Sequence, residues 1–364
     1  MNGNRGNIMS KLKFALVGCG RIAKKHTEAL NELEEAELVS VCDIKEDKAK
    51  EYGDKFDIPY YTSYDEMLQN EDVDIVNILT PSGLHAEHTI DIVSKYQKNV
   101  IVEKPMALKL DDADEMIRVC DENGVRLFVV KQNRYNLPVM KLREAVEEGR
   151  FGKMVMGTVR VRWSRHQHYY DMDDWRGTWA MDGGALTNQA SHHIDLLEWM
   201  MGQPVEVSAQ TATRLVDIEV EDTGAVIIKF ANGSIGIIEA TTATRPSDLE
   251  GSLSVMGEKG AVVIGGYAVN KMETWQFEDE RESDKTVMEE YKENPPNIYG
   301  FGHKRYIADV IDAVKNDKKA LVDGLEGRKS LELINAIYEA AETGKTVKLR
   351  FEPKKSKLGI KDEE

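Results

Sequence analysis

The 364-residue chain is poor in cysteine and in long apolar runs, and both shortages exclude whole classes of protein. Its three cysteines, Cys19, Cys42 and Cys120, form no CxxC pair, which argues against a disulfide framework or a cysteine zinc site. No apolar run reaches the roughly 18 residues that span a bilayer. The polar start, residues 1–11, lacks the apolar segment of a secretion signal. We therefore expect a cytoplasmic protein that binds no membrane.

Positive charge is also scarce, because 48 Lys and Arg residues face 64 Asp and Glu residues and leave a formal net charge of −16. Nucleic-acid binders usually show the opposite balance, so no nucleic-acid partner is expected. Anionic ligands would need a local concentration of positive charge. One part of the chain offers it, at Lys131, Arg134, Arg160, Arg162, Arg165 and Arg176.

In the first third of the chain, short apolar runs alternate with helical patterns. The apolar runs predict buried strands at 13–18, 38–43, 74–80, 99–103 and 125–130. The helical patterns cover 21–33, 45–56, 85–96 and 111–123. Strands that alternate with helices of about 10–15 residues predict a parallel sheet. We expect an α/β Rossmann domain over residues 12–135, after a flexible leader at 1–11.

After residue 135 the pattern changes to consecutive strands. Strand-like segments lie at 154–164, 205–213, 224–230, 234–242, 251–256 and 261–264, and two helical patterns follow at 303–316 and 327–343. Asn232-Gly233 is a hairpin signal. Strands without intervening helices predict an α+β domain with a large, mainly antiparallel open sheet. We place it at 136–352, expect its last helices to pack back on the Rossmann domain, and expect a charged tail at 353–364.

A glycine-rich motif follows the first predicted strand. Residues 18–23 read GCGRIA and fit G-x-G-x-x-G/A in the strand–turn–helix context of a dinucleotide site. Gly18 permits the tight turn, and Gly20 lets the backbone approach a pyrophosphate at the helix N-terminus. Asp43 ends the second strand, where a carboxylate holds the ribose hydroxyls and repels a 2′-phosphate. The pattern predicts NAD, against the alternative of a plain glycine turn with a surface aspartate.

Two further segments end predicted strands. Thr80–His85 (TPSGLH) lies at the carboxyl end of the third strand, where ligands of parallel sheets bind, although the same residues also cap helices well. Both interpretations stay open. Glu103-Lys104-Pro105 closes the fourth strand, and a lysine there would point at a bound nicotinamide. The default for an isolated lysine is a surface position.

The order of these motifs resembles the glucose–fructose oxidoreductase, inositol dehydrogenase and rhizopine-catabolism (Gfo/Idh/MocA) family over nearly the whole chain. The resemblance implies an NAD-dependent oxidoreductase that acts on the CH–OH group of a sugar, with Lys104 as a catalytic residue. The family's D-x-x-x-H-x-I-D pattern reads NQASHHID at 188–195, so its histidine falls on His192. Its acid is replaced by Asn188, which removes a possible partner for the histidine. Positions 188 and 192 are expected to share one helix face.

Longer motifs resemble one branch of that family, the UDP-N-acetyl-2-amino-2-deoxyglucuronate 3-dehydrogenases. They lie at 129–135, 175–179, 182–186, 188–192, 219–223 and 299–303. The resemblance implies oxidation of the 3-hydroxyl of a UDP-N-acetylglucosaminuronic acid to the 3-keto sugar, in nucleotide-sugar and polysaccharide biosynthesis. It also favours a homotetramer over a dimer, and allows a 2-oxo acid to reoxidise NADH in place.

The residue chemistry and the resemblance together give two sets of site residues. The cofactor set is Gly18, Gly20, Arg21, Ile22, Asp43, Thr80, Pro81, Leu84, His85, Glu103, Lys104, Gln132, Trp175 and Arg176. The substrate set is Lys104, Arg160, Arg162, Arg165, Tyr169, Asn188, His192 and His303. Guanidinium groups suit a pyrophosphate or a carboxylate, although Arg160 and Arg162 alternate in a way that also fits a solvated strand face. His166 and His168 have no evident third ligand, so no metal is expected.

Several alternatives remain open. His192 is the preferred base and Lys104 the group that stabilises the developing alkoxide, but the two roles could be exchanged. A dehydrogenase of a free sugar or inositol is a second hypothesis, and a catalytically silent NAD-binding sensor or assembly protein is a third. The silent protein would need neither Lys104 nor His192. We expect a homo-oligomer that pairs through an open sheet face carrying Val159 and Val161.

Overall fold

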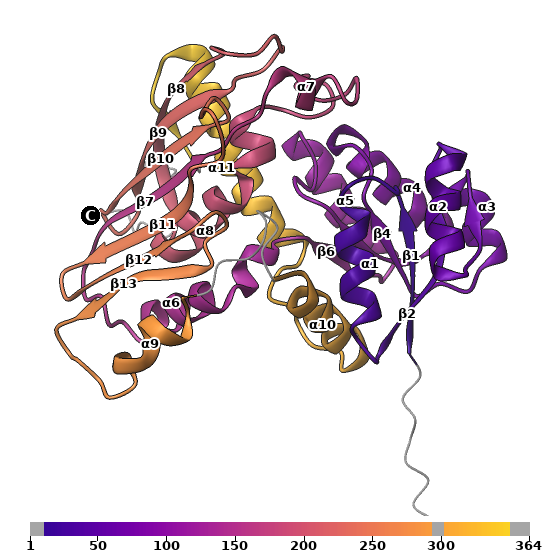
Figure 1. Ribbon diagram of the computed structural model, residues 1–364, viewed down its shortest axis with the longest axis horizontal. Coiled ribbons are helices and arrows are strands. Elements are labelled where there is room, and N and C mark those ends of the chain that lie inside the picture. Colours follow the sequence, from indigo (N-terminus) through magenta and orange to yellow (C-terminus); the bar gives the residue numbers. More distant parts are fainter. Residues whose placement is uncertain (1–10, 293–301, 350–364) are drawn as a thin grey trace, which may run out of the picture.

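The computed structural model describes residues 11–292 and 302–349 (Figure 1). Its first sheet has six strands in the order β3-β2-β1-β4-β5-β6, and all neighbours are parallel. The strands are β1 (Leu12–Val17), β2 (Ala36–Cys42), β3 (Tyr60–Tyr61), β4 (Ile75–Ile78), β5 (Asn99–Val102) and β6 (Leu127–Val129). This is the strand order of a Rossmann fold, with its switch point between β1 and β4. The expected parallel sheet is confirmed.

Helices cover both faces of this sheet because each crossover between parallel strands carries one. They are α1 (Ala23–Asn31), α2 (Glu46–Phe56), α3 (Tyr64–Asn70), α4 (His85–Tyr96) and α5 (Leu110–Glu122). β4 and most of β1 and β5 are buried, which explains their nearly continuous apolar sequence. Asn77 in β4 is the polar exception and is used in the site described below. β3 was not predicted because its two residues leave no period to read, and the short helix α3 that follows it was missed as well.

The second sheet has eight strands in the order β13-β12-β11-β7-β10-β9-β8-β14. They are β7 (Met154–Arg162), β8 (Pro204–Ala212), β9 (Thr223–Phe230), β10 (Ile235–Thr241), β11 (Glu250–Gly257), β12 (Gly260–Gly265), β13 (Lys271–Phe277) and β14 (Val347–Lys348). Neighbours are antiparallel except for the parallel pair β7 and β10, so the mainly antiparallel sheet is confirmed. Gly233 turns the β9–β10 hairpin with a φ of +85°, at the predicted Asn-Gly signal.

One face of the second sheet is covered by helices and the other is open. The helices of this part are α6 (Leu137–Glu147), α7 (Gln167–Tyr170), α8 (Ser191–Met201), α9 (Asp284–Glu290), α10 (Gly302–Lys315) and α11 (Gly324–Thr343). Figure 1 shows α8 and α11 between this sheet and the Rossmann domain, and both helices contact its strands.

The expectation that Val159 and Val161 lie on the open face is wrong. They are 0 % and 1 % exposed and belong to the core that includes α8. Arg160 and Arg162 take the open face instead. Alternation determined which residues share a face, but it did not determine which face the helices would cover.

The last helices return to the Rossmann domain. α10 packs against α1 and against the 3₁₀ turn η2 (Gln132–Tyr135), and α11 packs against α5 and β6. Because η2 contacts both α8 and α10, a domain boundary at residue 135 remains a proposal. The predicted leader (apart from Lys11), the tail at 353–364 and residues 350–352 lie outside the described residues. Within the described ranges, no helix has the length and apolar character needed to cross a membrane.

Candidate active site

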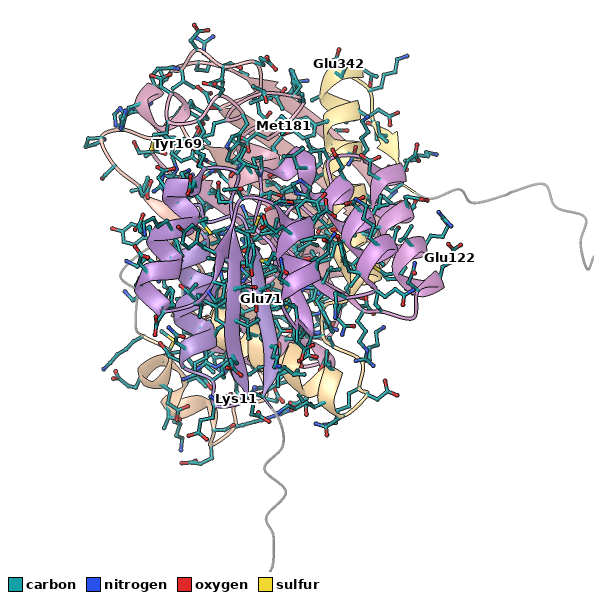
Figure 2. All side chains as sticks on the ribbon, turned by 90° about the vertical axis from the view of Figure 1, so that its right-hand side faces the viewer. Lys11, Glu71, Glu122, Tyr169, Met181 and Glu342 are labelled. Atoms are coloured by element: carbon teal, nitrogen blue, oxygen red, sulfur yellow. The ribbon has the colours of Figure 1, made fainter. Side chains whose placement is uncertain are left out.

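The second domain reaches over the carboxyl ends of the Rossmann strands. In Figure 2, Lys11 marks the beginning of β1 at the lower end of the sheet, whereas Tyr169 and Met181 lie at the opposite end. The Gly83 amide donates a hydrogen bond to the Met181 carbonyl (2.9 Å), so the loop 171–184 lies against the predicted cofactor loop. A Cβ at Gly83 would approach the Ala180 carbonyl to 2.6 Å, which explains a glycine at this contact.

The glycine turn after β1 has the shape that a dinucleotide requires. Gly18 has a φ of +106°, and a Cβ there would lie 2.7 Å from the Leu79 carbonyl oxygen, so other residues are excluded. A Cβ at Gly20 would meet nothing within 4 Å, which leaves open space where a pyrophosphate approaches. Asp43 accepts hydrogen bonds from the Cys19 amide (2.8 Å) and the Lys45 amide (2.9 Å). Its carboxylate is thereby fixed beside the turn, and these residues fit the pyrophosphate and ribose of NAD.

The other predicted residues of this region divide into two groups. Arg21 is exposed at the beginning of α1, and Ile22 packs against the Rossmann core. Thr80, Pro81 and Leu84 are half-buried around η1 (Ser82–Leu84).

His85 was also predicted to contact the cofactor, and its ring joins two loops. Its ring nitrogens face the Pro105 carbonyl (2.7 Å) and the Thr80 carbonyl (2.8 Å). His85 therefore ties two loops together and has no ring nitrogen left for NAD.

Glu103 and Lys104 follow β5. The side chain of Glu103 pairs with His26 Nε2 (2.9 Å) and accepts a hydrogen bond from the Lys104 amide (3.1 Å). Burial raises the pKa of Glu103, but the hydrogen bond and charge of His26 outweigh it and hold the pKa at about 2. His26 is positioned in turn by Asn77 (2.9 Å). Glu103 is thus a buried anion that anchors the backbone of Lys104.

The Lys104 ammonium crosses to the second domain. Its Nζ donates to the backbone carbonyl of Asn188 (2.6 Å), which ties the end of β5 to the segment before α8. Burial is the main cause that lowers the pKa of Lys104. A lysine held in this way can donate a hydrogen bond to a substrate hydroxyl placed beside it.

His192 lies in the first turn of α8 and is buried. Burial, followed by the charges of Lys104 and Lys131, lowers the pKa of His192 well below its ordinary value. Among the described residues, no group forms a hydrogen bond with His192 Nδ1. The ring is therefore neutral near pH 7 and can accept a proton.

The expectation that Asn188 and His192 share one helix face is wrong. Asn188 belongs to a π-helical turn, η3 (Ala185–Gln189), which ends before α8 begins at Ser191. The Asn188 side chain donates to Asp182 Oδ1 and accepts from Gln189 Nε2 (2.7 Å). Sequence reasoning missed the role of Asp182, although an acid directly before Gly183-Gly184 was its visible signal.

Three guanidinium groups surround Tyr169. Their centres lie 5.9 Å (Arg21), 5.5 Å (Arg165) and 4.8 Å (Arg176) from the ring centroid. The Tyr169 hydroxyl accepts hydrogen bonds from Arg176 (3.0 Å) and Gln189 (3.2 Å). Arg176 also stacks on Trp175 (4.4 Å). We call Arg21, Arg165 and Arg176 the Tyr169 cluster; it joins both domains at the rim of the site.

Arg160 and Arg162 are not brought to this place. They lie on the open face of the second sheet, opposite α8. Both pair there with Glu239 and Glu250, and the Arg162 pairs are 2.7 and 3.2 Å long. Within one chain, therefore, the structure separates them from Lys104 and His192.

The remaining predicted residues are buried beneath the site. Gln132 in η2 has no partner for its side-chain oxygen among the described residues. His303 begins α10 with its ring against His26 (5.8 Å between centroids), and burial lowers its pKa to about 3. The neighbouring residues of its motif, 299–301, lie outside the described ranges. The donor atoms of His26, Glu103 and His303 lie within 4.8 Å of one another, but His26 and Glu103 already bond to each other.

Two profiles of one protein family match the chain. The profile described as "Oxidoreductase family, NAD-binding Rossmann fold" covers residues 12–131, and "Oxidoreductase family, C-terminal alpha/beta domain" covers 143–349. The chain belongs to the Gfo/Idh/MocA oxidoreductase family. It is an NAD-dependent oxidoreductase. We propose that the glycine turn and Asp43 hold the cofactor.

Solved structures and curated relatives agree with this assignment. WlbA dehydrogenases from Bordetella pertussis and Chromobacterium violaceum, both in complex with NADH and UDP-GlcNAcA, are 40 % and 43 % identical to this chain. Their TM-scores are 0.87 and 0.88, and the matches cover 94 % of this chain and 99 % and 97 % of theirs. Myo-inositol 2-dehydrogenase from Thermotoga maritima is 27 % identical over 350 residues, which are 93 % of this chain and 98 % of the relative. The Gfo/Idh/MocA chain is thus similar to sugar and polyol dehydrogenases over more than nine-tenths of its length.

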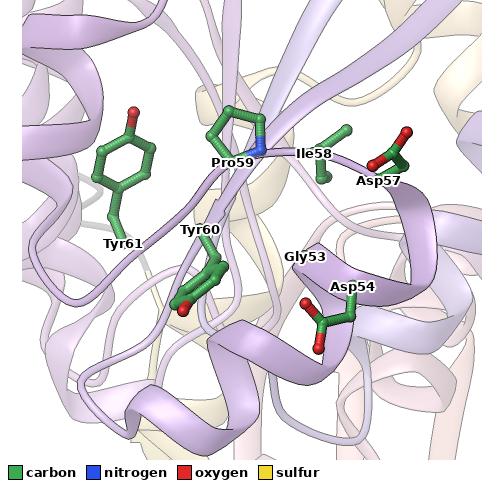
Figure 3. Close-up of a pocket in the computed structure, with 7 residues that line it drawn as sticks. All are labelled: Gly53, Asp54, Asp57, Ile58, Pro59, Tyr60 and Tyr61. Atoms are coloured by element: carbon green, nitrogen blue, oxygen red, sulfur yellow. The ribbon is translucent and has the colours of Figure 1, made fainter.

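A surface hollow elsewhere on this oxidoreductase contains none of the predicted site residues. It measures about 500 Å³ and lies beside β3 at the edge of the Rossmann sheet (Figure 3). The residues that line it are Gly53, Asp54, Asp57, Ile58, Pro59, Tyr60 and Tyr61. The hollow is open and away from Lys104, so we assign it no part in the reaction.

Asp43 is expected to make this oxidoreductase prefer NADH over NADPH. Two amides hold its carboxylate beside the glycine turn, and a 2′-phosphate bound near it would be repelled by its charge. In Asp43→Ser, the ratio of the affinity for NADH to the affinity for NADPH is expected to fall about tenfold, because one charge-assisted contact contributes about that much to affinity. Fluorescence titration with both nucleotides measures this. Asp54→Ser, an exposed carboxylate of α2, is the matched control, and equal affinity of the parent for both nucleotides would contradict the assignment.

Proposed function

We propose that this oxidoreductase oxidises the 3-hydroxyl of a UDP-N-acetylglucosaminuronic acid to the 3-keto sugar, with NAD, for nucleotide-sugar and polysaccharide biosynthesis. One observation carries the proposal. Lys104 and the neutral His192 lie beside a chain of polar contacts, Asn188 to Gln189 to Tyr169, that leads to the Tyr169 cluster. A group that accepts a proton thus stands next to a concentration of guanidinium groups, as an anionic sugar nucleotide requires.

The relatives support the same substrate class. The WlbA structures contain UDP-GlcNAcA and are more similar to this chain than the inositol dehydrogenase is. Among the described residues Arg165 and Arg176 pair with Asp248 (3.0 Å) and Asp173 (3.1 Å), and no acid pairs with Arg21. A free polyol carries no charge that could pair with Arg21. The inositol dehydrogenase at 27 % identity keeps a free polyol as the second candidate, and activity can distinguish the two.

The residues of this chain divide the chemical work. The glycine turn and Asp43 would hold NAD, which would supply the acceptor for the hydride of the carbinol carbon. His192 is positioned to take the hydroxyl proton, because its ring is neutral near pH 7. Lys104 donates a hydrogen bond to the same oxygen and stabilises its developing negative charge. The loop 171–184 contacts the loop after β4 through the hydrogen bond from the Gly83 amide to the Met181 carbonyl (2.9 Å).

We also infer a homo-oligomer, a tetramer or a dimer, that pairs through the open face of the second sheet. Ile227, Ile235 and Met256 are exposed on that face, beside the charged rows of Arg160 and Arg162. An apolar patch of this kind is typical of an interaction surface. Any substrate contact of Arg160 or Arg162 would have to reach a neighbouring copy. A 41 kDa monomer in light scattering would contradict the inference.

The substrate is tested by product analysis. The protein is incubated with NAD and UDP-GlcNAcA, and in parallel with myo-inositol and with the sugar acid free of UDP. We expect a UDP-linked ketone, two hydrogen atoms lighter than the substrate, in mass spectra of the first reaction alone. Adding a 2-oxo acid to the product complex tests whether the bound NADH is reoxidised in place. Oxidation of inositol without oxidation of the UDP-sugar acid would overturn the proposal.

Arg165 is expected to bind the substrate without taking part in the chemical step. In Arg165→Gln, the affinity for UDP-GlcNAcA should fall about ten- to a hundredfold, which is the value of one charge-assisted contact. The single-turnover rate at saturation should change little. Arg118→Gln is the matched control, because Arg118 pairs only with Glu115 and Glu122 of its own helix α5. Equal loss of affinity in both variants would refute this role of Arg165.

A further inference from the structure

One buried acid near the reacting groups has no role in the mechanism so far. Asp182 is 2 % exposed and lies in the loop that leads into η3. Within residues 11–292 and 302–349 no ion pair of Asp182 is found, and Arg176 and Lys104 act on it by charge alone. Burial raises the pKa of Asp182. A carboxyl group kept in such a place costs free energy, so its retention needs a reason.

The hydrogen bonds around Asp182 fit the ionised form. Oδ2 accepts from the Gly177 amide (2.8 Å), and Oδ1 accepts from Asn188 Nδ2. The orientation of the Asn188 amide is fixed by Gln189, whose Nε2 donates to Asn188 Oδ1 (2.7 Å). Donors therefore run in one direction, from Gln189 through Asn188 to Asp182. Both of these contacts are donors, so neither offers an acceptor to the O–H of a protonated Asp182.

Asn188 connects this acid to Lys104. The Asn188 carbonyl accepts from Lys104 Nζ at 2.6 Å, and no second hydrogen bond of that ammonium is found in the described part of the chain. Asp182 thus binds the side chain of Asn188, and the backbone carbonyl of Asn188 binds the Lys104 ammonium. The position of Lys104 Nζ depends on a contact between the two domains that Asp182 fixes.

The sequence shows where this acid stands relative to the expected one. In the family pattern D-x-x-x-H-x-I-D an acid stands four residues before the histidine, and here these two positions are Asn188 and His192. Asp182, six residues before Asn188, brings a carboxylate to the Asn188 side chain. The motif position itself carries no acid, but the carboxylate of Asp182 lies against it.

We propose that Asp182 is a positioning residue that keeps Lys104 cationic and holds its ammonium against the Asn188 carbonyl. The proposal rests on the proposed function only in that Lys104 acts on the substrate hydroxyl. It also assigns the two roles that the sequence left open. Lys104, with its proton retained, is the hydrogen-bond donor to the developing alkoxide, and His192 is the base.

The charges around Lys104 make Asp182 decisive. The charged and titratable groups that act on Lys104 from the packed elements are Glu103 after β5, Asp182 before η3, Lys131 after β6, Arg176 in the loop 171–184 and His192 on α8. Glu103 and Asp182 favour the ammonium, whereas Lys131 and Arg176 oppose it. Without the charge of Asp182, one anion would face two cations, and Lys104 would lose its proton at lower pH.

The test removes the carboxylate at position 182 in one variant. A second variant then places a carboxylate at position 188, the hydrogen-bond partner of position 182. Asp182→Asn keeps the size of the side chain and an oxygen that can accept from Asn188. The alkaline limb of the single-turnover rate is expected to move to lower pH. On that limb the rate follows the protonated fraction of Lys104, so a pKa lower by about one pH unit costs about tenfold in rate. The double variant Asp182→Asn, Asn188→Asp reverses the carboxylate–amide pair and should recover most of the lost rate.

Two controls separate this role from simple packing. NADH affinity and the unfolding midpoint of the full chain should change little in Asp182→Asn, because neither depends on the proton of Lys104. An unchanged pH profile in Asp182→Asn overturns the proposal. So does a loss of rate that follows the loss of folded protein and is not recovered by the double variant.

The proposed substrate is tested separately, so the two failures can be distinguished. A parent protein that does not oxidise UDP-GlcNAcA refutes the substrate, and the pH series is then run with the polyol that it does oxidise. A readout without turnover is the titration of Lys104 by nuclear magnetic resonance after reductive ¹³C-methylation, with Lys104→Arg identifying its signal. Asp182→Asn should lower the Lys104 pKa, and an unchanged pKa overturns the proposal whatever the substrate.

Discussion

Replacing His192 with alanine is expected to lower the rate of the chemical step by about 10²–10⁴-fold, with little change in substrate affinity. The ring lies at the beginning of α8, near enough for the Lys104 charge to lower its pKa. Without it, no neutral base stands beside the hydroxyl. Lys104→Ala should cause a loss of similar kind, because the alkoxide then develops without its donor. Single-turnover reduction of NAD, with substrate affinity measured separately, is the appropriate experiment.

A matched control is the next residue of the same helix. His193 is also buried, but its ring packs edge-on against Trp163 in the core of the second domain. His193→Ala should lower stability and leave the rate per folded molecule nearly unchanged. If His192→Ala and Lys104→Ala both turned over at the parent rate, the assigned centre would be wrong. Tyr169 and His303 would then be the next candidates to test.

The pH dependence of this step follows from the same surroundings. Burial, with the charges of Lys104 and Lys131, holds the pKa of His192 well below 6.5. The free protein therefore keeps its base deprotonated at pH 6.5, and the acid limb of kcat/KM should lie below that pH. An acid limb centred at or above pH 6.5 would show that another group is the base.

The cofactor half of the site could be predicted from the sequence because its geometry is local. The glycine turn, the helix after it and the carboxylate that follows β2 all belong to one βαβ unit. They lie within one segment of 26 residues, from Gly18 to Asp43. The alternating apolar and helical patterns predicted five of the six Rossmann strands correctly. β3 was missed because its two residues have no period.

The substrate half was predicted less well because it depends on contacts distant in sequence. The strand alternation at 158–164 grouped Arg160 with Arg162 but did not show that helices would cover the Val159 face. The i, i+4 spacing of Asn188 and His192 assumed an unbroken helix, and the π-helical turn changes the direction of Asn188. Asp182 and His26 acquire their roles only when two domains or two elements pack together.

Replacing Asp195 with alanine is expected to lower the free energy of unfolding by about 3–5 kcal/mol, the range for a buried ion pair that loses one partner. Asp195 on α8 accepts two hydrogen bonds from the Arg134 guanidinium (2.8 Å each) and lies 3.7 Å from Lys131 Nζ. All three side chains are almost fully buried. Removing the carboxylate leaves two cations close together, with Glu326 as the nearby acid for Arg134 (3.1 Å) and Ser330 as the partner of Lys131 (2.6 Å).

The loss of stability should be measured by denaturant unfolding of the full chain. A variant of an exposed carboxylate–guanidinium pair should be measured in parallel as the control. Asp114 pairs with Arg328 where both side chains are partly exposed, so Asp114→Ala should cost below about 1 kcal/mol. Burial raises the pKa of Asp195, but the Arg134 and Lys131 charges outweigh it and hold the pKa below 3.8. The stability from this carboxylate is therefore complete above the unfolded value and lost as the pH falls through the folded one. The difference between parent and Asp195→Ala should shrink over that acid range, and a difference below about 1 kcal/mol at neutral pH would show that the buried cations are not held by Asp195.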